Sequence, residues 1–278
     1  MKLILTLVAF LITGLALAQD YENRPWMSLE NRIGLAFGIG SVTYLDKNSS
    51  PLIYQSRPKN VRLFYNLESN TFLFSFDLDV KLGNNFPKYH KDRTLYFQEE
   101  DYKGNQEDKK FPAGGSLMAG RISVGAYYKI ASTQESTFKV AVGGRIMNEL
   151  FYPQGWNTGG MFNSLSLSPE AVTQHRINEH HQVTAALRIP LIALLSRLPY
   201  DNTVSAPVKK QVEGFFHHSG WTGPSKFLAP ALALGYNYQI NTRWGAGLNY
   251  ELNWYNIQTP QPMKAQSQSL LANFHHQF

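Results

Sequence analysis

The sequence has 278 residues, a formal net charge of +6 and no cysteine. The lack of cysteine excludes disulfide bonds, thiol catalysis and a lipid-modified cysteine after a leader segment. The basic residues are dispersed along the chain and not gathered into a patch, so we expect no nucleic-acid partner.

The chain begins with the pattern of a secretory signal. Lys2 precedes an apolar stretch, and Ala16-Leu17-Ala18 forms a small-residue cleavage site. A membrane-anchoring helix is the alternative, but about thirteen apolar residues are few for a span that needs roughly 20. We therefore expect residues 1–18 to be removed and residues 19–278 to form one domain. No later apolar run is long enough for a transmembrane helix.

Beyond residue 30, apolar and polar residues alternate in ten segments, which is the pattern of strands with one apolar face. The sixth segment is the weakest because Pro169 interrupts it. The predicted strands cover 32–44, 60–67, 71–82, 117–130, 137–147, 164–177, a segment starting near 182, 227–240, 243–256 and the closing segment 269–278.

The ninth segment, RWGAGLNYELNWYN, is longer than a usual strand of a soluble sandwich. Its two tryptophans lie on the same face, and ten residues of a tilted strand span roughly 27 Å, close to the apolar band of an outer-membrane barrel with its two aromatic girdles. The predicted girdle consists of Tyr236, Tyr238, Trp244, Trp254 and Phe278.

The connections between the predicted strands alternate in length. Those after strands 2, 4, 6 and 8 are short, whereas those after the odd strands are longer and include 83–116 and 196–226. Outer-membrane barrels alternate short periplasmic turns with long extracellular loops in this way. The sequence therefore predicts an all-β fold, a single antiparallel transmembrane β-barrel of ten strands, with eight or twelve as alternatives.

The closing stretch LLANFHHQF resembles the carboxyl-terminal signature of bacterial outer-membrane β-barrel proteins, which end in an aromatic residue preceded by alternating apolar positions. Phe278, Phe274, Ala272 and Leu270 match this signature, and His276 departs from it. The resemblance implies a Gram-negative outer membrane, contact with its lipid, and recognition by the barrel-assembly machinery during biogenesis. It identifies a class of protein and no subfamily.

The alternation also predicts which side chains face the lumen. One wall should be charged, the opposite wall should carry mainly alanine and glycine, and the charged residues should pair across the lumen because a buried charge needs a partner. The predicted lumen charge network consists of Arg62, Asp77, Asp79, Arg121, Arg145, Glu170, Arg188 and Glu251. The alternative is that the flat wall leaves a cleft for a loop, a plug or a small anionic ligand.

The sequence contains no convincing catalytic group, cofactor motif or metal site. Adjacent histidines such as His275-His276 point to opposite faces of a strand. His217-His218 with Asp201 or Glu213 could form a zinc site, but solvated loop residues explain them better. An acid–base role for the Asp77 and Asp79 pair is weaker than pairing with neighbouring basic residues.

Two long connections carry further patterns. QEEDYKGNQEDKK is predicted to be a solvated mobile loop, because Lys103 takes a position that a calcium loop would give to an acidic ligand. PLIALLSRLPY is either the top of a strand or a helix against the membrane. APVKKQVEGFF predicts a short amphipathic helix from Pro207.

We therefore expect a barrel with a filled or narrow lumen. The leading functional hypothesis is a non-enzymatic surface-binding protein or an accessory subunit of an outer-membrane complex, with a protein partner bound through residues 190–225. The alternatives are a narrow, anion-favouring solute channel and, third, an outer-membrane hydrolase.

Overall fold

The computed structural model describes residues 30–48, 50–90, 94–100, 106–132, 138–154, 161–197, 215–217 and 219–278. The predicted signal segment 1–18 lies outside them, as does the predicted helix from Pro207, except for one helical turn at residues 215–217. Within the described residues, no helix is both long and apolar enough to cross a membrane.

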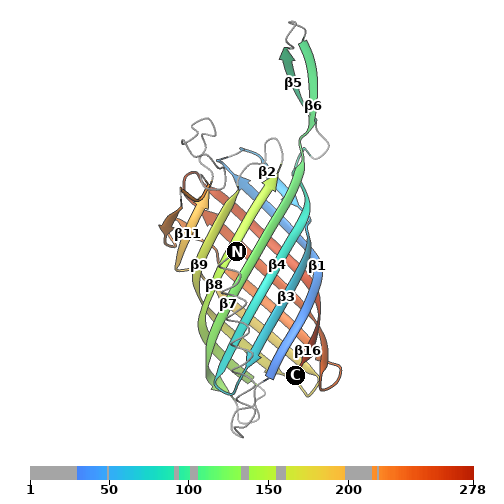
Figure 1. The fold of residues 1–278 in the computed structure, drawn as a ribbon, viewed down its shortest axis with the longest axis vertical. Helices are drawn as coiled ribbons and strands as arrows, with labels where there is room; N and C mark the ends of the chain where they lie inside the picture. Colours follow the sequence, from blue (N-terminus) through green and yellow to red (C-terminus); the bar gives the residue numbers. More distant parts are fainter. Residues whose placement is uncertain are drawn as a thin grey trace.

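Ten long strands form a closed antiparallel ring (Figure 1). The ring closes where the last strand pairs with the first, from Arg32–Gln277 to Asp46–Met263. Its strands, in chain order, are β1 (Glu30–Asp46), β3 (Lys59–Glu68), β4 (Phe72–Pro87), β7 (Gly115–Ser132), β8 (Phe138–Gln154), β9 (Phe162–Arg176), β10 (His181–Arg188), β14 (Ala231–Gln239), β15 (Trp244–Ile257) and β16 (Met263–Gln277). The prediction of a ten-stranded barrel is thus confirmed.

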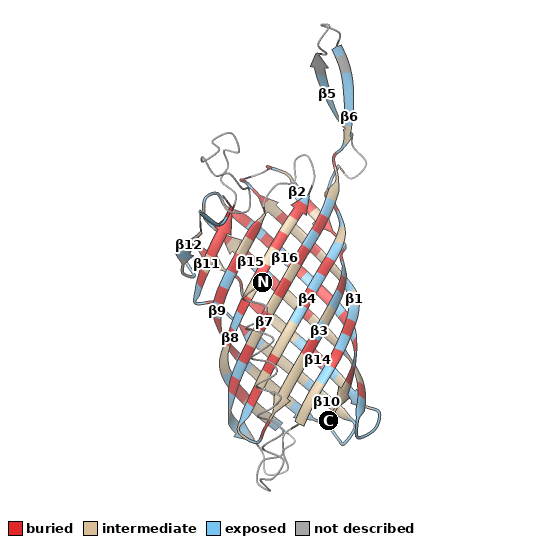
Figure 2. Cartoon of the chain, in the orientation of Figure 1, coloured by how far each residue is buried: buried red, intermediate tan, exposed pale blue. Residues whose placement is uncertain are grey.

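Alternation of side chains explains why these segments form a barrel with an apolar outside. On β4, for example, Phe72, Leu78 and Leu82 are exposed on the outer face, whereas Asp79 and Lys81 are buried inside. Bands of buried and exposed residues accordingly alternate along many of the strands in Figure 2. Several short connections, at 69–71, 177–180 and 240–243, lie at one end of the barrel together with Phe278, whose backbone pairs with Asn31. We call this the short-turn end, and the opposite end the long-loop end.

Several strands are extended by further pieces at the long-loop end, and a proline stands at each break. Pro58, Pro190 and Pro230 lie at these breaks. The carbonyl of Pro58 still accepts a hydrogen bond from Gly40 (2.8 Å), and that of Pro230 accepts one from Trp254 (3.0 Å), so pairing continues past the break. The extensions are β2 (Ile53–Ser56), β11 (Ile192–Arg197) with its partner β12 (Gly220–Thr222), and β13 (Phe227–Leu228). PLIALLSRLPY was expected to form either the top of a strand or a helix against the membrane. It forms the strand β11.

The expectation that Pro169 interrupts the sixth strand was wrong. β9 runs through Pro169, which lies opposite Gly144 of β8. The Pro169 carbonyl accepts a hydrogen bond from Ile189 (3.2 Å), at the break between β10 and β11. The N–H and C=O of one strand residue point to the same side. The N–H that Pro169 lacks would therefore also point to this break, so no hydrogen bond between strands is lost and proline is tolerated.

The prediction of a mobile loop between β4 and β7 was also wrong in part. This connection contains a hairpin of β5 (Thr94–Glu100) and β6 (Gln106–Pro112), paired from Thr94–Pro112 to Glu100–Gln106. The hairpin projects well beyond the barrel (Figure 1). β-branched and aromatic residues in TLYF favour a strand, and this preference outweighs the charged residues that suggested a loop.

β1 and β16 approach each other closely at Gly38, where an added Cβ would overlap the Leu270 carbonyl. No neighbour lies within 4 Å of the equivalent Cβ at Gly120. We expect Gly38→Ala to lower the free energy of unfolding by about 1–3 kcal/mol, because the backbone must shift. Gly120→Ala is the matched control and should change it by less than about 0.5 kcal/mol. Urea unfolding in lipid vesicles measures both, and equal midpoints would contradict the close approach.

Candidate functional site

The lumen contains a layer of ion pairs that joins opposite sides of the barrel. Arg121 of β7 pairs with Glu251 of β15 through both carboxylate oxygens, one of them 2.8 Å from Arg121 Nη2. β7 and β15 are five strands apart in either direction around the ten-strand ring, so this contact spans the full diameter. We call Arg62, Asp79, Arg121, Arg188 and Glu251 the ion-pair layer.

Glu251 is the centre of the ion-pair layer. It accepts hydrogen bonds from three guanidinium groups, those of Arg62, Arg121 and Arg188, the last at 3.2 Å. Asp79 pairs with Arg121 at 3.0 Å and with Arg62 at 3.2 Å. Three positive charges therefore share two carboxylates, all of them largely buried, and removal of one carboxylate leaves charges without compensation.

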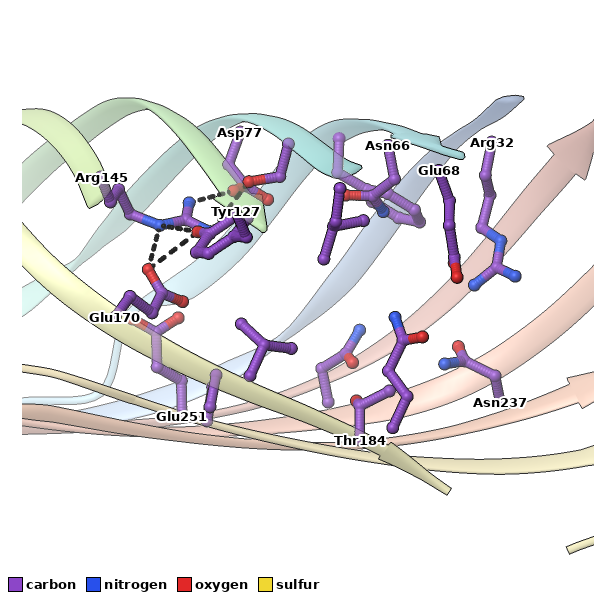
Figure 3. A pocket seen from close by; sticks show the side chains of 18 of the residues that line it. Arg32, Asn66, Glu68, Asp77, Tyr127, Arg145, Glu170, Thr184, Asn237 and Glu251 are labelled. Atoms are coloured by element: carbon purple, nitrogen blue, oxygen red, sulfur yellow. Dashed lines mark hydrogen bonds and ion pairs between the residues drawn. The ribbon is translucent and has the colours of Figure 1, made fainter. Parts of the chain in front are cut away.

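A second cluster covers one wall nearer the short-turn end (Figure 3). Arg145 of β8 pairs with Asp77 (2.6 Å) and with Glu170 (2.6 Å). The Tyr127 hydroxyl donates to Glu170 at 3.0 Å and accepts from Arg145. This cluster joins neighbouring strands and does not cross the lumen. All eight residues of the predicted charge network face the lumen, and the structure divides them between these two clusters.

Aromatic side chains fill the lumen on the long-loop side of the ion-pair layer. Tyr44 stacks on Tyr54 (ring centroids 5.5 Å apart) and contacts Phe151 edge-on (5.2 Å). Phe151 stacks on Phe162 (5.3 Å), which in turn contacts Tyr255 (5.9 Å). Since β1 and β8 are four strands apart on the ring, the Tyr44–Phe151 contact also crosses the lumen. We call these five residues the aromatic plug.

On the other side of the ion-pair layer, toward the short-turn end, lies a cavity of about 210 Å³. Glu68, Asp77, Arg145 and Glu170 line one side of it. The opposite side carries small and amide residues, and Figure 3 shows Thr184 and Asn237 there. These residues are Thr184, Ala186, Ala233, Asn237, Asn249 and Asn273. The charged and flat walls therefore face each other across this cavity, which we call the lumen cavity.

The ionic lining of the lumen cavity is balanced in number. Five arginines and five carboxylates line it: Arg32, Arg62, Arg121, Arg145, Arg188, Glu30, Glu68, Asp77, Glu170 and Glu251. A second hollow of about 250 Å³ lies at its mouth and shares Glu30, Arg32 and Asn237 with it. The lumen cavity and this hollow therefore adjoin each other, and the hollow lies at the short-turn end of the barrel.

The predicted girdle residues are exposed on the outer face at two levels. Tyr236, Tyr238, Trp244 and Phe278 lie toward the short-turn end, and Trp254 lies toward the other end of β15. Outside the barrel, His276 packs against Trp244 (4.5 Å between centroids). Inside it, His275 is buried with its Nδ1 atom 3.1 Å from the Asn273 side-chain oxygen. The two histidines thus face opposite sides.

Three carboxylates with partners inside the barrel were absent from the predicted charge network. Glu68 is shared by Lys129 (2.7 Å) and Lys139 (2.8 Å). Glu149 accepts a hydrogen bond from the Tyr255 hydroxyl (2.7 Å), and Asp46 pairs with Arg197 (2.6 Å) near the long-loop end. Glu149, Asp46 and Arg197 lie in stretches that extend beyond the predicted strands, which is why the inward pattern did not reveal them.

The groups considered for metal binding or hydrolysis are not brought together. No cluster of three metal-ligating side chains occurs within the described ranges, and Asp201 and Glu213 lie outside those ranges. Asp77 and Asp79 belong to different ion-pair clusters, with Arg145 and with Arg121 respectively.

No family model matches the chain, and no curated protein matches it. Solved structures similar to it include Neisserial surface protein A, at 12% identity and a TM-score of 0.37, covering 91% of this chain and 99% of that one. An outer membrane channel from Pseudomonas putida F1 has 9% identity and a TM-score of 0.40, covering 93% and 98%. Ail, the attachment invasion locus protein of Yersinia pestis, has 10% identity and a TM-score of 0.29, covering 88% and 98%. These structures are outer-membrane proteins of different functions, so the likeness assigns no function to this chain.

Proposed function

We propose that this chain is an integral outer-membrane β-barrel with a closed lumen. It acts as a non-enzymatic surface-binding protein or as an accessory subunit of an outer-membrane complex. The observation that carries the proposal is the pair of cross-lumen contacts at different depths, Arg121–Glu251 in the ion-pair layer and Tyr44–Phe151 in the aromatic plug. A lumen crossed twice by buried side chains is suited to holding a barrel together and poorly suited to passing solutes.

The apolar outer face supports the membrane location. Leu35, Phe37 and Ile39 on β1, and Leu270 and Phe274 on the neighbouring β16, are exposed side by side. A continuous apolar belt of this kind is stable against lipid and would be unstable in water. With this location, the long-loop end faces the outside of the cell.

Two features at the long-loop end would serve a partner. One is the projecting β5–β6 hairpin. The other is an exposed apolar surface formed by Ile192 of β11 and Trp221 of β12, with Trp221 exposed at 67%; Leu191 and Phe216, outside these two strands, are exposed as well. Aromatic residues are enriched at protein interfaces. This surface falls within residues 190–225, where we expect the protein partner to bind.

The purified barrel should give a sealed baseline in a planar lipid bilayer, because both layers block the lumen. Steady single-channel current through the parent protein would overturn the closed-lumen proposal in favour of a narrow channel. An absence of current is evidence for a sealed lumen only if the protein is folded. A heat-dependent shift in its gel mobility shows that it is.

Copurification from gently solubilised membranes tests the partner. Trp221→Ser should reduce recovery of the partner by about tenfold or more if the aromatic ring is a central anchor of the interface. Ile130→Ser, at an exposed apolar position on β7, is the control and should leave recovery unchanged. Equal recovery of the partner with both variants would show that the interface does not include Trp221 of β12.

A further inference from the structure

We propose that the lumen cavity is a binding site, entered from the short-turn end, for a small polar solute that carries a phosphate or carboxylate group. The anionic group lies between the guanidinium groups of Arg32 and Arg176. The neutral part of the solute contacts the flat wall, which we now call the amide wall after its residues Asn237, Asn249 and Asn273. This inference concerns the end of the barrel opposite the proposed partner surface and does not depend on that surface.

Arg32 and Arg176 are the first reason for this assignment. Both line the mouth of the cavity, together with Glu30 and Glu179. Neither forms an ion pair with any described carboxylate. Glu68 and Glu30 both attract Arg32 electrostatically, but neither forms an ion pair with it, and the Glu68 carboxylate is already shared by Lys129 and Lys139. Each of these guanidinium groups offers the planar fork of N–H donors that phosphates and carboxylates bind.

The amide wall is the second reason. Asn237 and Asn249 line the cavity on this wall, and Asn66 lies across from them beside Glu68 (Figure 3); the side chains of these three residues form no hydrogen bond with another described residue. Gly247 keeps this wall open, since a Cβ there would lie 2.7 Å from the Asn237 side-chain oxygen and 2.8 Å from the Asn273 side-chain nitrogen. Side-chain amides both donate and accept hydrogen bonds, which suits hydroxyl groups.

The closed inner end is the third reason. Arg62, Arg121 and Arg188 of the ion-pair layer line the inner end of the cavity, and their guanidinium groups are occupied by Glu251. A solute that enters from the short-turn end therefore meets free guanidinium groups at the mouth and paired ones at the inner end. This arrangement binds a solute and does not transport it across the barrel.

Isothermal titration calorimetry on the purified full chain at low salt tests the site with four probes. Glucose 6-phosphate and gluconate supply the two anion chemistries, glucose supplies the neutral body alone, and inorganic phosphate supplies the anion alone. We expect at least one of the two sugar anions to bind, and the one that binds identifies the preferred anion. We expect no heat from glucose and weaker binding of inorganic phosphate. Higher salt should weaken binding because the contacts are ionic.

Substitutions test which residues bind the solute. Arg32→Gln and Arg176→Gln should each weaken binding of the sugar anion by about tenfold or more, as expected for the loss of hydrogen bonds to a charged group. Asn237→Ala should weaken binding of the sugar anion and leave that of inorganic phosphate unchanged. Arg57→Gln, at an exposed position on the long-loop side, should bind like the parent. Arg176 is exposed, so its variant remains informative if Arg32→Gln does not fold.

The proposal is overturned if neither sugar anion binds at millimolar concentration. It is also overturned if Arg176→Gln binds like the parent, or if Arg57→Gln loses as much affinity as Arg176→Gln. The last result would mean that anions associate with the basic chain without a site.

Discussion

The Glu251→Gln variant should lose about 3–5 kcal/mol of its free energy of unfolding, the usual cost of breaking a buried ion pair from one side. Glu251 accepts hydrogen bonds from three guanidinium groups and is almost fully buried. Without its charge, Asp79 would be the remaining ion-pair partner of Arg62 and Arg121, and Arg188 would keep its hydrogen bond to the Asn253 side chain. Urea unfolding in lipid vesicles, followed by tryptophan fluorescence, measures the loss.

Two further variants decide whether the loss comes from the uncompensated charges. Replacing both partners, as in Arg121→Met with Glu251→Met, should recover part of the stability, because an apolar pair leaves fewer buried charges unpaired. Asp108→Asn, at an exposed position on the β6 strand of the projecting hairpin, should change stability by less than about 0.5 kcal/mol. A loss in the double variant as large as in Glu251→Gln would contradict the electrostatic explanation.

The outer face of the barrel could be predicted because lipid imposes one requirement on every outward position. Where the lumen is polar, inward and outward residues differ, and the period of two appears in the sequence. Where the aromatic plug fills the lumen, this difference disappears. β8 illustrates the limit, since it was predicted to end at 147 and continues to Gln154, and the inward positions of this continuation include the apolar Phe151.

The members of the charge network could also be predicted from alternation, but their pairing could not. Alternation tells which face a residue occupies, whereas the pairing of Arg121 with Glu251 depends on how the ring closes and on how far each strand is shifted against the next. The break at Pro190 adds to this difficulty. Pro190 and Ala193 are both buried, so the inward positions change parity there, and extrapolation from β10 gives the wrong face for β11.

Opening the barrel should require removal of both layers, because the ion-pair layer and the aromatic plug block the lumen in series. We expect Arg121→Ala with Glu251→Ala to remain sealed in a planar bilayer, because Tyr44, Phe151 and Phe162 still fill the lumen beyond the layer. The plug variant, Phe151→Ala with Phe162→Ala, should also remain sealed. The combination of all four substitutions should conduct.

The ion selectivity of the combined variant follows from the charges that remain. Arg62, Lys81 and Arg188 would then face Asp79 and Glu149 at this depth, so positive charges still outnumber negative ones and the current should be carried mainly by anions. A heat-dependent shift in gel mobility must first establish that the variant folds, since truncation of two buried phenylalanines costs several kcal/mol each, roughly 3–5. Current through either double variant would show that its intact layer does not seal. A folded combined variant without current would place a further block among the long loops, and a cation-selective current would contradict the charge assignment of the layer.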